Sequence, residues 1–354
     1  MSATPALQVG KLPAWVDWRL LDDGMRFFVE TWPLVFVSFG WAVVGGFGCE
    51  SASAVLLESR YWAASGESGR RDTWKRLRET ACWLHDICAG GAQAFEPGGR
   101  AWAAALHVRY LHARTRAELA AKHPAGVTSL LSAEFGAPIN QLQLVGTLLG
   151  SSALLLQGIE RAMGLPLRAR DKEGFIHLWR LVGHLFGIDD DKNPNRSFAH
   201  ALTVMQSVFL YAIPAHPRPQ LTHALTSHIY TAVVQGTSED YGVPVSEALL
   251  AAQARLYLGR AYSDAIGLPR VSTLHTLAAL LRLLAFRALF WPYFLLGALG
   301  EASGASSSRL ARTAAMLHSR VIRLAYHGLM ARSFASLVHR VRVKQPSCRF
   351  GKSA

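Results

Sequence analysis

Several common signatures of catalytic and nucleotide-binding proteins are missing from this sequence of 354 residues. It has no Gly-x-x-x-x-Gly-Lys-[Ser/Thr] phosphate loop, no Gly-x-Ser-x-Gly nucleophile turn, no His-Glu-x-x-His zinc motif and no strand followed by Gly-x-Gly-x-x-Gly. The sequence therefore gives no support for a P-loop nucleotidase, a serine hydrolase of the α/β type, a zinc peptidase or a Rossmann dehydrogenase.

Cysteine is also scarce, with only four in the chain. Four are too few for a disulfide framework in a chain of this length, so we expect a reduced, intracellular setting. Cys82, His85 and Cys88 have the spacing C-x-x-H-x-x-C. On a helix these positions drift around the axis, and no fourth ligand lies close by, so small buried core residues are favoured over a metal cluster.

Charged residues make up only 17% of the chain, and hydrophobic residues make up 51%. Such an excess of apolar side chains must enter a large core, a cofactor pocket or a membrane surface. The net charge is +13, and no Asp or Glu follows Glu301, although ten Lys and Arg residues do. A basic, amphipathic C-terminus suits an anionic lipid surface. Because no recognition motif for nucleic acid is present, we expect no nucleic-acid partner.

A secretory signal peptide is not expected, because the first 25 residues are charged and have no apolar stretch. Residues 32–49 are uncharged and reach the lower length limit for a membrane span. Their Gly, Pro and Trp content fits a buried helix pair or a monotopic insertion as well as a span. Residues 288–300 are too short to cross alone but could lie in an interface. We expect an intracellular, membrane-associated protein, on the endoplasmic reticulum or another organelle, with the cytoplasm as the alternative.

Hydrophobic periodicity is helical almost throughout, as in "VSTLHTLAALLRLLAFRALF". Gly and Pro pairs divide the chain into about a dozen helices, and no repeat of 20–50 residues indicates a solenoid. The sequence predicts an all-α protein with a single large helical domain at residues 26–300. Residues 1–25 form an N-terminal extension, and residues 301–354 form a basic helical C-terminal region.

Two rows of basic side chains lie at helical spacing on otherwise apolar segments. Arg109, His112 and Arg116 stand at i, i+3 and i+7, so they share one helix face. Buried arginine is costly unless it is paired, and a bound propionate or phosphate would satisfy two guanidinium groups. The alternative is that both arginines pair with protein carboxylates while His112 donates to a backbone carbonyl.

The second row, His177, Arg180 and His184, has the same spacing on a helix that we expect to begin near Asp171 and to end at Gly187. Two neutral imidazoles on one buried face could ligate iron, and a single one can hold haem iron. The alternative is a pair of satisfied core histidines.

A further polar group stands at a helix start after Pro138, where Asn140 and Gln141 are followed by Thr147. Helix capping and packing explain these residues as well as ligand binding does.

Six segments between about residues 35 and 270 resemble, in the same order, the MpaB and rubber-oxygenase (latex clearing protein) catalytic-domain family. They are "FGWAVVGGFG", "WKRLRETACWL", "FEPGGRAWAAALHVRYLHARTR", "PINQLQLVGTLL", "HLWRLVGHLFGID" and "RLYLGRAYSDAIGLPR". The resemblance implies an all-α protein with a globin-like core that binds haem b. It also implies oxidative cleavage of carbon–carbon double bonds in polyprenyl or terpenoid chains. The fungal branch of this family is bound to the endoplasmic reticulum membrane.

The sequence departs from the family at several positions. The proximal histidine of rubber oxygenases falls near Leu149, where this chain has no histidine. Tyr110 and Leu111 stand in place of a Lys-Thr pair, His107 in place of an arginine, and Gln143 in place of an acidic residue. The iron ligand therefore cannot be transferred by position.

The resemblance implies roles for the basic rows. We expect the iron ligand to be His184, His177 or His112, with the helix of His177 and His184 favoured, and Arg109 and Arg116 to bind propionates or position oxygen. Further contacts to the cofactor are expected from Gln141, Thr147 and Arg180. Asp86 is the candidate general base for removal of an allylic proton, and Arg109 is a second catalytic candidate.

The expected function is that of a haem-b-dependent oxygenase that uses O₂ to cleave or oxidise a C=C bond of an apolar, isoprenoid or lipid-like substrate. One alternative is a non-catalytic, membrane-associated helical binding protein of the same fold that has lost haem. Another is a haem protein that senses or carries a ligand.

Overall fold

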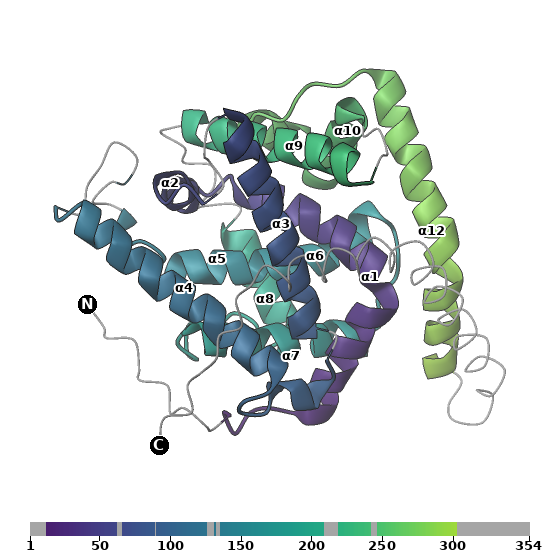
Figure 1. Ribbon diagram of the computed structural model, residues 1–354. Coiled ribbons are helices and arrows are strands. Elements are labelled where there is room, and N and C mark those ends of the chain that lie inside the picture. The colour runs from purple at the N-terminus through teal and green to yellow at the C-terminus, as the bar shows by residue number, and fades with distance from the viewer. Residues whose placement is uncertain are drawn as a thin grey trace.

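The computed structural model describes residues 12–61, 66–88, 90–125, 131, 135–208, 219–241 and 246–302. All regular secondary structure in these ranges is helical, and they contain no strand (Figure 1). The prediction of an all-α fold is confirmed. The basic region beyond residue 302 lies outside the described residues.

The helices follow one another with short connections. In chain order they are α1 (Trp18–Gly46), α2 (Glu50–Glu58), α3 (Gly66–Cys88), the 3₁₀ turn η1 (Ala92–Phe95), α4 (Arg100–Lys122), α5 (Gln141–Ser151), α6 (Ala153–Gln157), the π-helical turn η3 (Gly158–Ala162), α7 (Ala169–Phe186), α8 (Phe198–Ser207), α9 (Pro219–Tyr241), α10 (Glu247–Leu258), α11 (Arg260–Ala265) and α12 (Thr273–Ala302).

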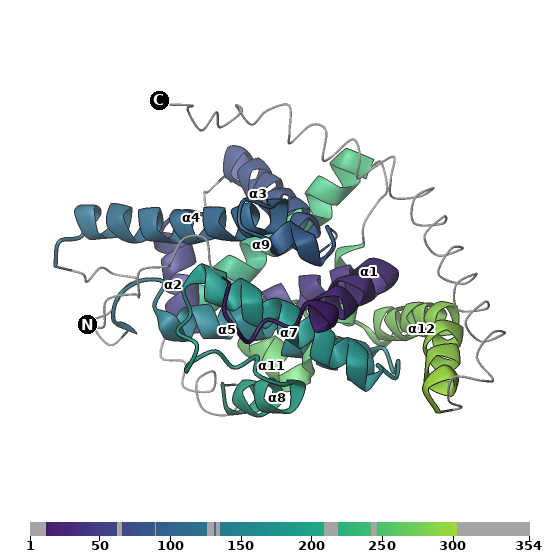
Figure 2. The ribbon, with the colours of Figure 1, turned by 90° about the horizontal axis from the view of Figure 1, so that it is seen from below.

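Helix α7 packs most extensively on α1 and also contacts α4 and α5 (Figures 1 and 2). It crosses α1 where two glycines face each other. A Cβ atom on Gly24 would lie 2.2 Å from the carbonyl oxygen of Gly174, and one on Gly174 would lie 2.7 Å from the nitrogen of Gly24. Only hydrogen fits between these backbones, so the two glycines permit the closest approach between α1 and α7.

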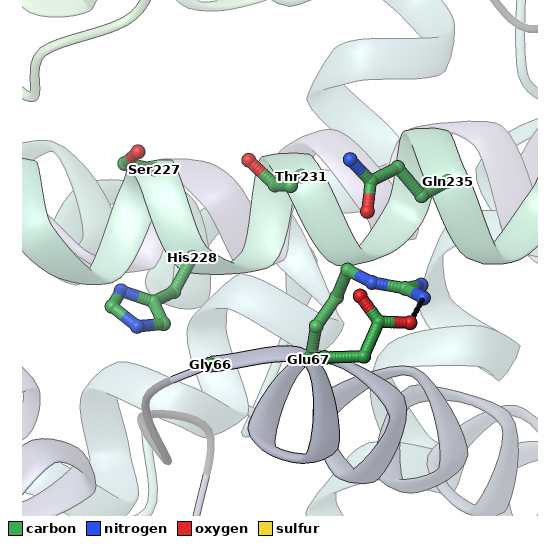
Figure 3. A pocket seen from close by; sticks show the side chains of 7 residues that line it. Gly66, Glu67, Ser227, His228, Thr231 and Gln235 are labelled. Carbon is green, nitrogen blue, oxygen red and sulfur yellow. Dashed lines mark hydrogen bonds and ion pairs between the residues drawn. The ribbon is translucent and has the colours of Figure 1, made fainter.

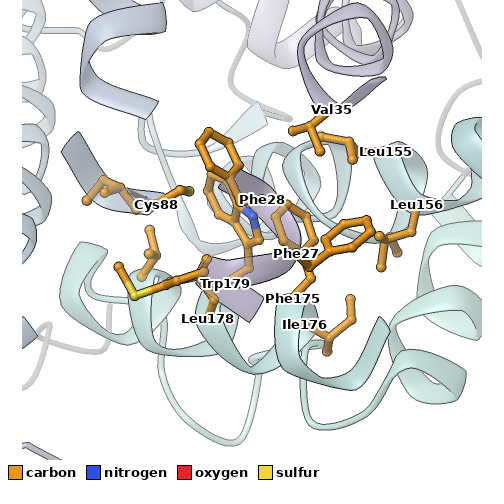
Figure 4. Close-up of a cluster of buried hydrophobic side chains, with 14 of the residues drawn as sticks. Phe27, Phe28, Val35, Cys88, Leu155, Leu156, Phe175, Ile176, Leu178 and Trp179 are labelled. Atoms are coloured by element: carbon orange, nitrogen blue, oxygen red, sulfur yellow. The ribbon is translucent and has the colours of Figure 1, made fainter. Parts of the chain in front are cut away.

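The main hydrophobic core surrounds this crossing. Phe27 and Phe28 from α1 meet Phe175 and Trp179 from α7, and Leu155 from α6 packs on the same cluster (Figure 4). The Phe27 and Phe175 rings meet edge to face with their centroids 5.6 Å apart. Aromatic side chains bury the largest apolar areas of any residue type, so this cluster contributes much of the hydrophobic stabilisation of the domain.

The ends of α7 differ in how well the sequence predicts them. Gly187 ends the helix in the left-handed conformation, with φ +92°, as expected for a C-terminal glycine. The start lies two residues before Asp171, at Ala169, with Arg168 as the N-cap. Asp171 lies in the first turn and accepts hydrogen bonds from the Arg168 guanidinium, so it forms an ion pair inside the helix and does not mark the first residue.

The apolar stretch at residues 32–49 forms the second part of α1 and the turn after it. The helix is kinked at Thr31, which has non-helical dihedral angles two residues before Pro33. Trp32, Leu34, Val35, Val44 and Phe47 are buried inside the protein, and Val37, Phe39, Trp41 and Val43 are partly buried against the hydrophobic cores. This burial favours the core-helix interpretation of the segment.

Within the residues that the structure describes, two helical stretches are long and apolar enough to cross a membrane, residues 141–162 and residues 273–292. A bent pair, residues 18–35 and 37–46, passes the same test if it is counted as one span. The stretch at residues 141–162 is mostly buried in the protein, whereas only 11% of the stretch at residues 273–292 is buried. The apolar residues 288–300 are part of this second helix, α12.

We expect the Gly174→Ala substitution to lower the free energy of unfolding by about 1–3 kcal/mol, because the new methyl group would force α1 away from α7. Urea unfolding followed by circular dichroism would measure the change. Gly40→Ala is the matched control, since a Cβ there meets nothing within 4 Å and alanine favours the helix by about 1 kcal/mol. Equal effects of the two substitutions would contradict the close contact.

Candidate functional site

The first basic row lies on α4, which packs against α3 and α7. The His112 ring meets the Phe186 ring of α7 edge to face, with 5.8 Å between the centroids. Its Nδ1 atom is buried and has no hydrogen-bond partner within the described part of the chain. Burial and, to a lesser extent, the nearby charge of Arg116 lower the pKa of His112 to about 4. His112 is therefore a neutral imidazole near pH 7.

The two arginines of this row flank His112 and are both partly buried. The Arg116 guanidinium donates to the carbonyl oxygen of Ile139 over 3.1 Å, which satisfies an N–H group but carries no counter-charge. The Arg109 guanidinium lies close to the chain at Gly187, where a Cβ would be only 3.0 Å from its Cζ. Burial lowers the pKa of both arginines, and the charge of Arg116 lowers the pKa of Arg109 further.

Gln141, at the start of α5, contacts the turn at Gly187 that also lies beside Arg109. Its side-chain amide donates to the carbonyl oxygen of Gly187 and accepts from the backbone N–H of Asp189. Gln141 therefore fixes α5 to the turn that ends α7, beside Arg109. The structure thus brings together Arg109, His112, Arg116 and Gln141, and we call these four residues the α4 cluster.

Thr147 lies outside the α4 cluster. Its hydroxyl group donates to the Gln143 carbonyl oxygen of the preceding turn, and its side chain is exposed. Gln143 itself completes a capping box with Asn140 at the start of α5. A helix-capping role thus explains the glutamine that stands where the family has an acidic residue.

The second basic row, His177, Arg180 and His184, surrounds the ring of Trp15. The Arg180 guanidinium carbon lies 3.9 Å from the centroid of the Trp15 ring, and the two histidine rings meet the indole edge to face at 5.7 and 6.0 Å. The indole N–H donates to Asp190. Residues 12–17, which we call the N-terminal strap, therefore cover this face of α7.

Both histidines of the second row have partners within the protein. The backbone N–H of Asp17 donates to Nε2 of His177 over 2.9 Å, and Nδ1 of His184 lies 3.0 Å from a carboxylate oxygen of Asp190. Burial lowers the pKa of His177, and the charge of Arg180 contributes to the same effect, while Asp17 opposes it. In this arrangement the Nε2 lone pair of His177 is already used by a hydrogen bond.

The two basic rows lie on different sides of α7. Phe186, which contacts His112, and His184, which contacts Trp15, are two residues apart on the helix and so point in nearly opposite directions. One planar cofactor therefore cannot contact both rows in this arrangement, and the two sets of histidines are alternatives.

Asp86 is not close to either row. It lies on α3 and pairs with Arg100 at the start of α4, with 3.5 Å between Nη2 and the carboxylate. Arg100 and His112 are twelve residues apart on α4, or about 18 Å along the helix axis. The ion pair explains Asp86 as a tie between α3 and α4, and its role as a general base stays a prediction.

A wall of aromatic side chains that the sequence did not single out lies beside His112. Trp83 of α3 stacks near both Phe186 and Trp179, at 5.8 and 6.2 Å between centroids. The indole nitrogen of Trp179 is buried without a hydrogen-bond partner among the described residues. Both tryptophans fall within segments that resemble the family, so the resemblance could have identified them as site residues. The wall makes the neighbourhood of His112 apolar.

A pocket of about 270 Å³ lies elsewhere, between the start of α3 and α9 (Figure 3). Ser227, Thr231 and Gln235 form one side of it, and Glu67 and Arg70 form the other. Arg70 and Glu67 are joined by an ion pair of 3.0 Å. This lining is polar and contains none of the α4 cluster, so it does not suit an apolar substrate.

An iron ligand from histidine must be neutral and must offer a free ring nitrogen. His112 meets both conditions, and two cationic side chains beside it suit the carboxylates of a haem. Leu149, at the position of the family's proximal histidine, is 2% exposed and packs in the main core. No group of three or more His, Cys, Asp and Glu residues that could hold a metal ion by themselves occurs within the described ranges. The residues present therefore fit a haem through His112, and not through a preformed multi-ligand metal centre.

Comparison with known proteins decides the family. The model of the family described as "ER-bound oxygenase mpaB/B′/Rubber oxygenase, catalytic domain" matches residues 28–291. The chain belongs to this family. The rubber oxygenase of Streptomyces sp. (strain K30) is 27% identical over 272 residues, which cover 76% of this chain and 61% of that protein. The chain thus spans less than two thirds of this relative.

The fold of the MpaB/rubber-oxygenase family is also found by structural comparison. The structure of latex clearing protein LCP in the closed state superposes with a TM-score of 0.56 and 22% sequence identity, and the match covers 79% of this chain and 69% of that chain. At this identity the likeness concerns the fold. The α4 cluster and the second basic row both lie inside the matched domain.

We expect the free energy of unfolding of the cofactor-free protein to fall as the pH falls from about 6.5 to 4. Part of this loss should come from His112. The unfolded chain takes up a proton near pH 6.5 and the folded chain only near pH 4, so the unfolded state binds more protons within this window. In the His112→Gln variant this loss should be smaller by up to about 3 kcal/mol. Urea unfolding at several pH values would measure it. Parallel pH profiles of the two proteins would contradict a buried neutral imidazole.

We expect Trp15→Ala to lower the free energy of unfolding by about 2 kcal/mol, because it removes a cation–π contact, a hydrogen bond and apolar packing. Trp18→Ala is the matched control, since that side chain is 41% exposed and should change stability by less than about 0.5 kcal/mol. Thermal unfolding by circular dichroism would compare them. An unchanged midpoint in Trp15→Ala would show that the N-terminal strap does not hold α7.

Proposed function

We propose that this chain is a haem-b-dependent oxygenase that uses O₂ to cleave or oxidise a C=C bond in an apolar, isoprenoid or lipid-like substrate. Membership of an oxygenase family supports the reaction class. The single structural observation that supports the cofactor is the buried, unpartnered Nδ1 atom of His112, on an imidazole that is neutral near pH 7.

In this proposal the α4 cluster holds the cofactor. His112 ligates the iron, and Arg109 and Arg116 bind the two propionate groups, because guanidinium groups form strong, charge-assisted hydrogen bonds with carboxylates. Gln141 fixes the turn at Gly187 and so keeps Arg109 in place. When bound, haem b would supply the activation of O₂.

The remaining contribution of the chain is the apolar environment. In this proposal the half-buried Trp83 and Phe186 would offer hydrocarbon-like surface to an apolar chain on the His112 side of α7, and the buried Trp179 packs against Trp83 behind them. Low polarity around the iron strengthens every electrostatic contact there, including those of the two arginines. We include Arg109 as a group that could also orient oxygen.

His177 and His184 are the alternative iron ligands in this proposal, with Arg180 as their neighbour. For His177 to bind iron through Nε2, the N-terminal strap must leave α7, since the backbone N–H of Asp17 donates to that atom. The Nδ1 atom of His184 faces Asp190, and Trp15 of the strap lies against its ring, so the strap must also move before a planar cofactor can reach His184. We favour His112 because it needs no such release. Thr147 and Asp86 stay candidates only as more distant contributors.

A second candidate function is a non-catalytic, membrane-associated binding protein that has lost haem. It is favoured by one observation, the buried leucine at the position of the family's proximal histidine. In either case we propose an intracellular location at a membrane surface.

We expect protein purified from haem-supplemented cells to show a Soret band that shifts on reduction, and His112→Ala to lose most of its bound haem. His177→Ala and His184→Ala should retain it, and so should the control His228→Ala, which lies at the polar pocket on α9. Pyridine haemochrome titration would give the haem content. Full haem content in His112→Ala and loss in His177→Ala or His184→Ala would assign the ligand to the second row.

A colourless wild-type preparation that contains no iron would support the binding protein that has lost haem. If haem is present, oxygen consumption with a short polyisoprene or squalene would separate an oxygenase from a haem carrier or sensor, in which added substrate would not change O₂ uptake.

A further inference from the structure

Helix α12 carries an unusual concentration of exposed apolar side chains. Eight of the twelve large apolar side chains that are exposed in the described part of the chain belong to it. Leu274 is 72% exposed, Leu281 is 59% exposed and Leu284 is 55% exposed. Soluble monomers rarely expose contiguous apolar patches of this kind, so the patch indicates a contact with a partner or a membrane.

The orientation of α12 is fixed by its opposite face. Ala279, Phe290 and Phe294 are fully buried, and the helix packs on α10 along this side. Figures 1 and 2 place α12 at the edge of the molecule. The exposed residues therefore form an outer surface of the whole domain and are not a gap in its core.

The exposed residues fall on one face of the helix. At about 100° per residue, Leu274, Leu277, Leu281, Leu284 and Leu295 lie within a sector of about 80°, roughly opposite the buried face. We call these five residues the leucine face. A stripe of this width is typical of helices that insert one side into an apolar phase.

The charges around the leucine face are all positive. Arg282 lies on one flank, about 100° from Leu281. Arg287 lies on the other side, next to the buried Phe294, and its guanidinium group lies against Gly164. Helix α12 has no acidic residue before Glu301, and ten Lys and Arg but no Asp or Glu follow that residue. A leucine ridge flanked by a cation and free of carboxylates matches the boundary between acyl chains and anionic headgroups, where long arginine side chains reach the phosphates.

We propose that α12 lies in the plane of an anionic phospholipid bilayer, with the leucine face inserted among the acyl chains and Arg282 at the headgroup phosphates. This inference rests on the proposed membrane location and names the element and the lipid that provide it. It does not depend on haem, so it can fail or hold independently of the oxygenase.

Two other occupants fit the leucine face less well. A transmembrane orientation would place Arg282, near the middle of the helix, in hydrocarbon at a cost of about 2.5–3.5 kcal/mol, and the buried face of α12 is already used by the domain. A second copy of the chain would bring the flanking arginines of two identical helices together, and α12 offers no carboxylate before Glu301 to neutralise them.

Flotation of the full chain with phospholipid vesicles tests the proposal. We expect binding to vesicles of phosphatidylcholine with phosphatidylglycerol, and weaker binding to phosphatidylcholine alone. Leu277→Gln/Leu281→Gln should lower the partition coefficient by about tenfold or more, because two inserted apolar side chains are lost. Val29→Gln/Leu142→Gln is the matched control, since these exposed apolar side chains lie on α1 and α5.

Arg282→Gln should lower binding to the anionic vesicles by about fivefold and leave binding to phosphatidylcholine unchanged.

Any of the following three results would overturn the proposal. Equal vesicle binding by the two double variants would remove the leucine face as the contact. A change from dimer to monomer in Leu277→Gln/Leu281→Gln, with unchanged vesicle binding, would make the face an interface between copies. Resistance of the membrane-bound protein to alkaline carbonate extraction would indicate a span in place of an in-plane helix. The Soret spectrum of the same preparations separates failure of this proposal from failure of the proposed cofactor.

Discussion

The contact between Gly24 and Gly174 is the constraint on which the arrangement of the domain depends. It lets α1 and α7 approach to backbone contact, and the large aromatic side chains on both sides can then interdigitate in one core. The same contact decides what covers α7. Because the N-terminal strap directly precedes α1, bringing α1 onto α7 also brings Trp15 and Asp17 onto His177. The two glycines, Gly24 and Gly174, therefore also determine what lies against His177.

A second constraint is that few carboxylates are available to pair with the partly buried arginines of this chain. Arg180 is partly buried and lies over an indole ring, and Arg116 donates to a carbonyl group, so neither contact supplies a negative charge. Burying a guanidinium group in this way is costly, and a carboxylate ligand would offset that cost for the α4 cluster. The neutral His112 between the arginines follows from the same physics, since burial and a neighbouring positive charge both disfavour its protonation.

The high hydrophobic content of the chain is divided between two places. Most of it fills the core around α1, α6 and α7, which includes Leu149, near which we expect the family's iron ligand to fall. A second portion stays outside on α12. An oxygenase with an apolar substrate has a use for both features, because the substrate would reside in a lipid phase and must enter a dry site. The two features are independent in the structure, and each can exist without the other.

The sequence by itself determined the all-α fold, the end of α7 at Gly187, the family and the two rows of basic residues, since periodicity and glycine chemistry are local properties. It did not determine what either row faces. Both rows have the spacing i, i+3 and i+7, which fixes a common direction on a helix but not the neighbour in that direction. Only the tertiary structure placed Trp15 against His177, 162 residues away in the chain, paired Asp86 with Arg100, and left Nδ1 of His112 without a partner among the described residues. These outcomes depend on how helices distant in sequence cross, and at the centre of this domain the crossing is set by two glycines whose role becomes visible only when their backbones meet.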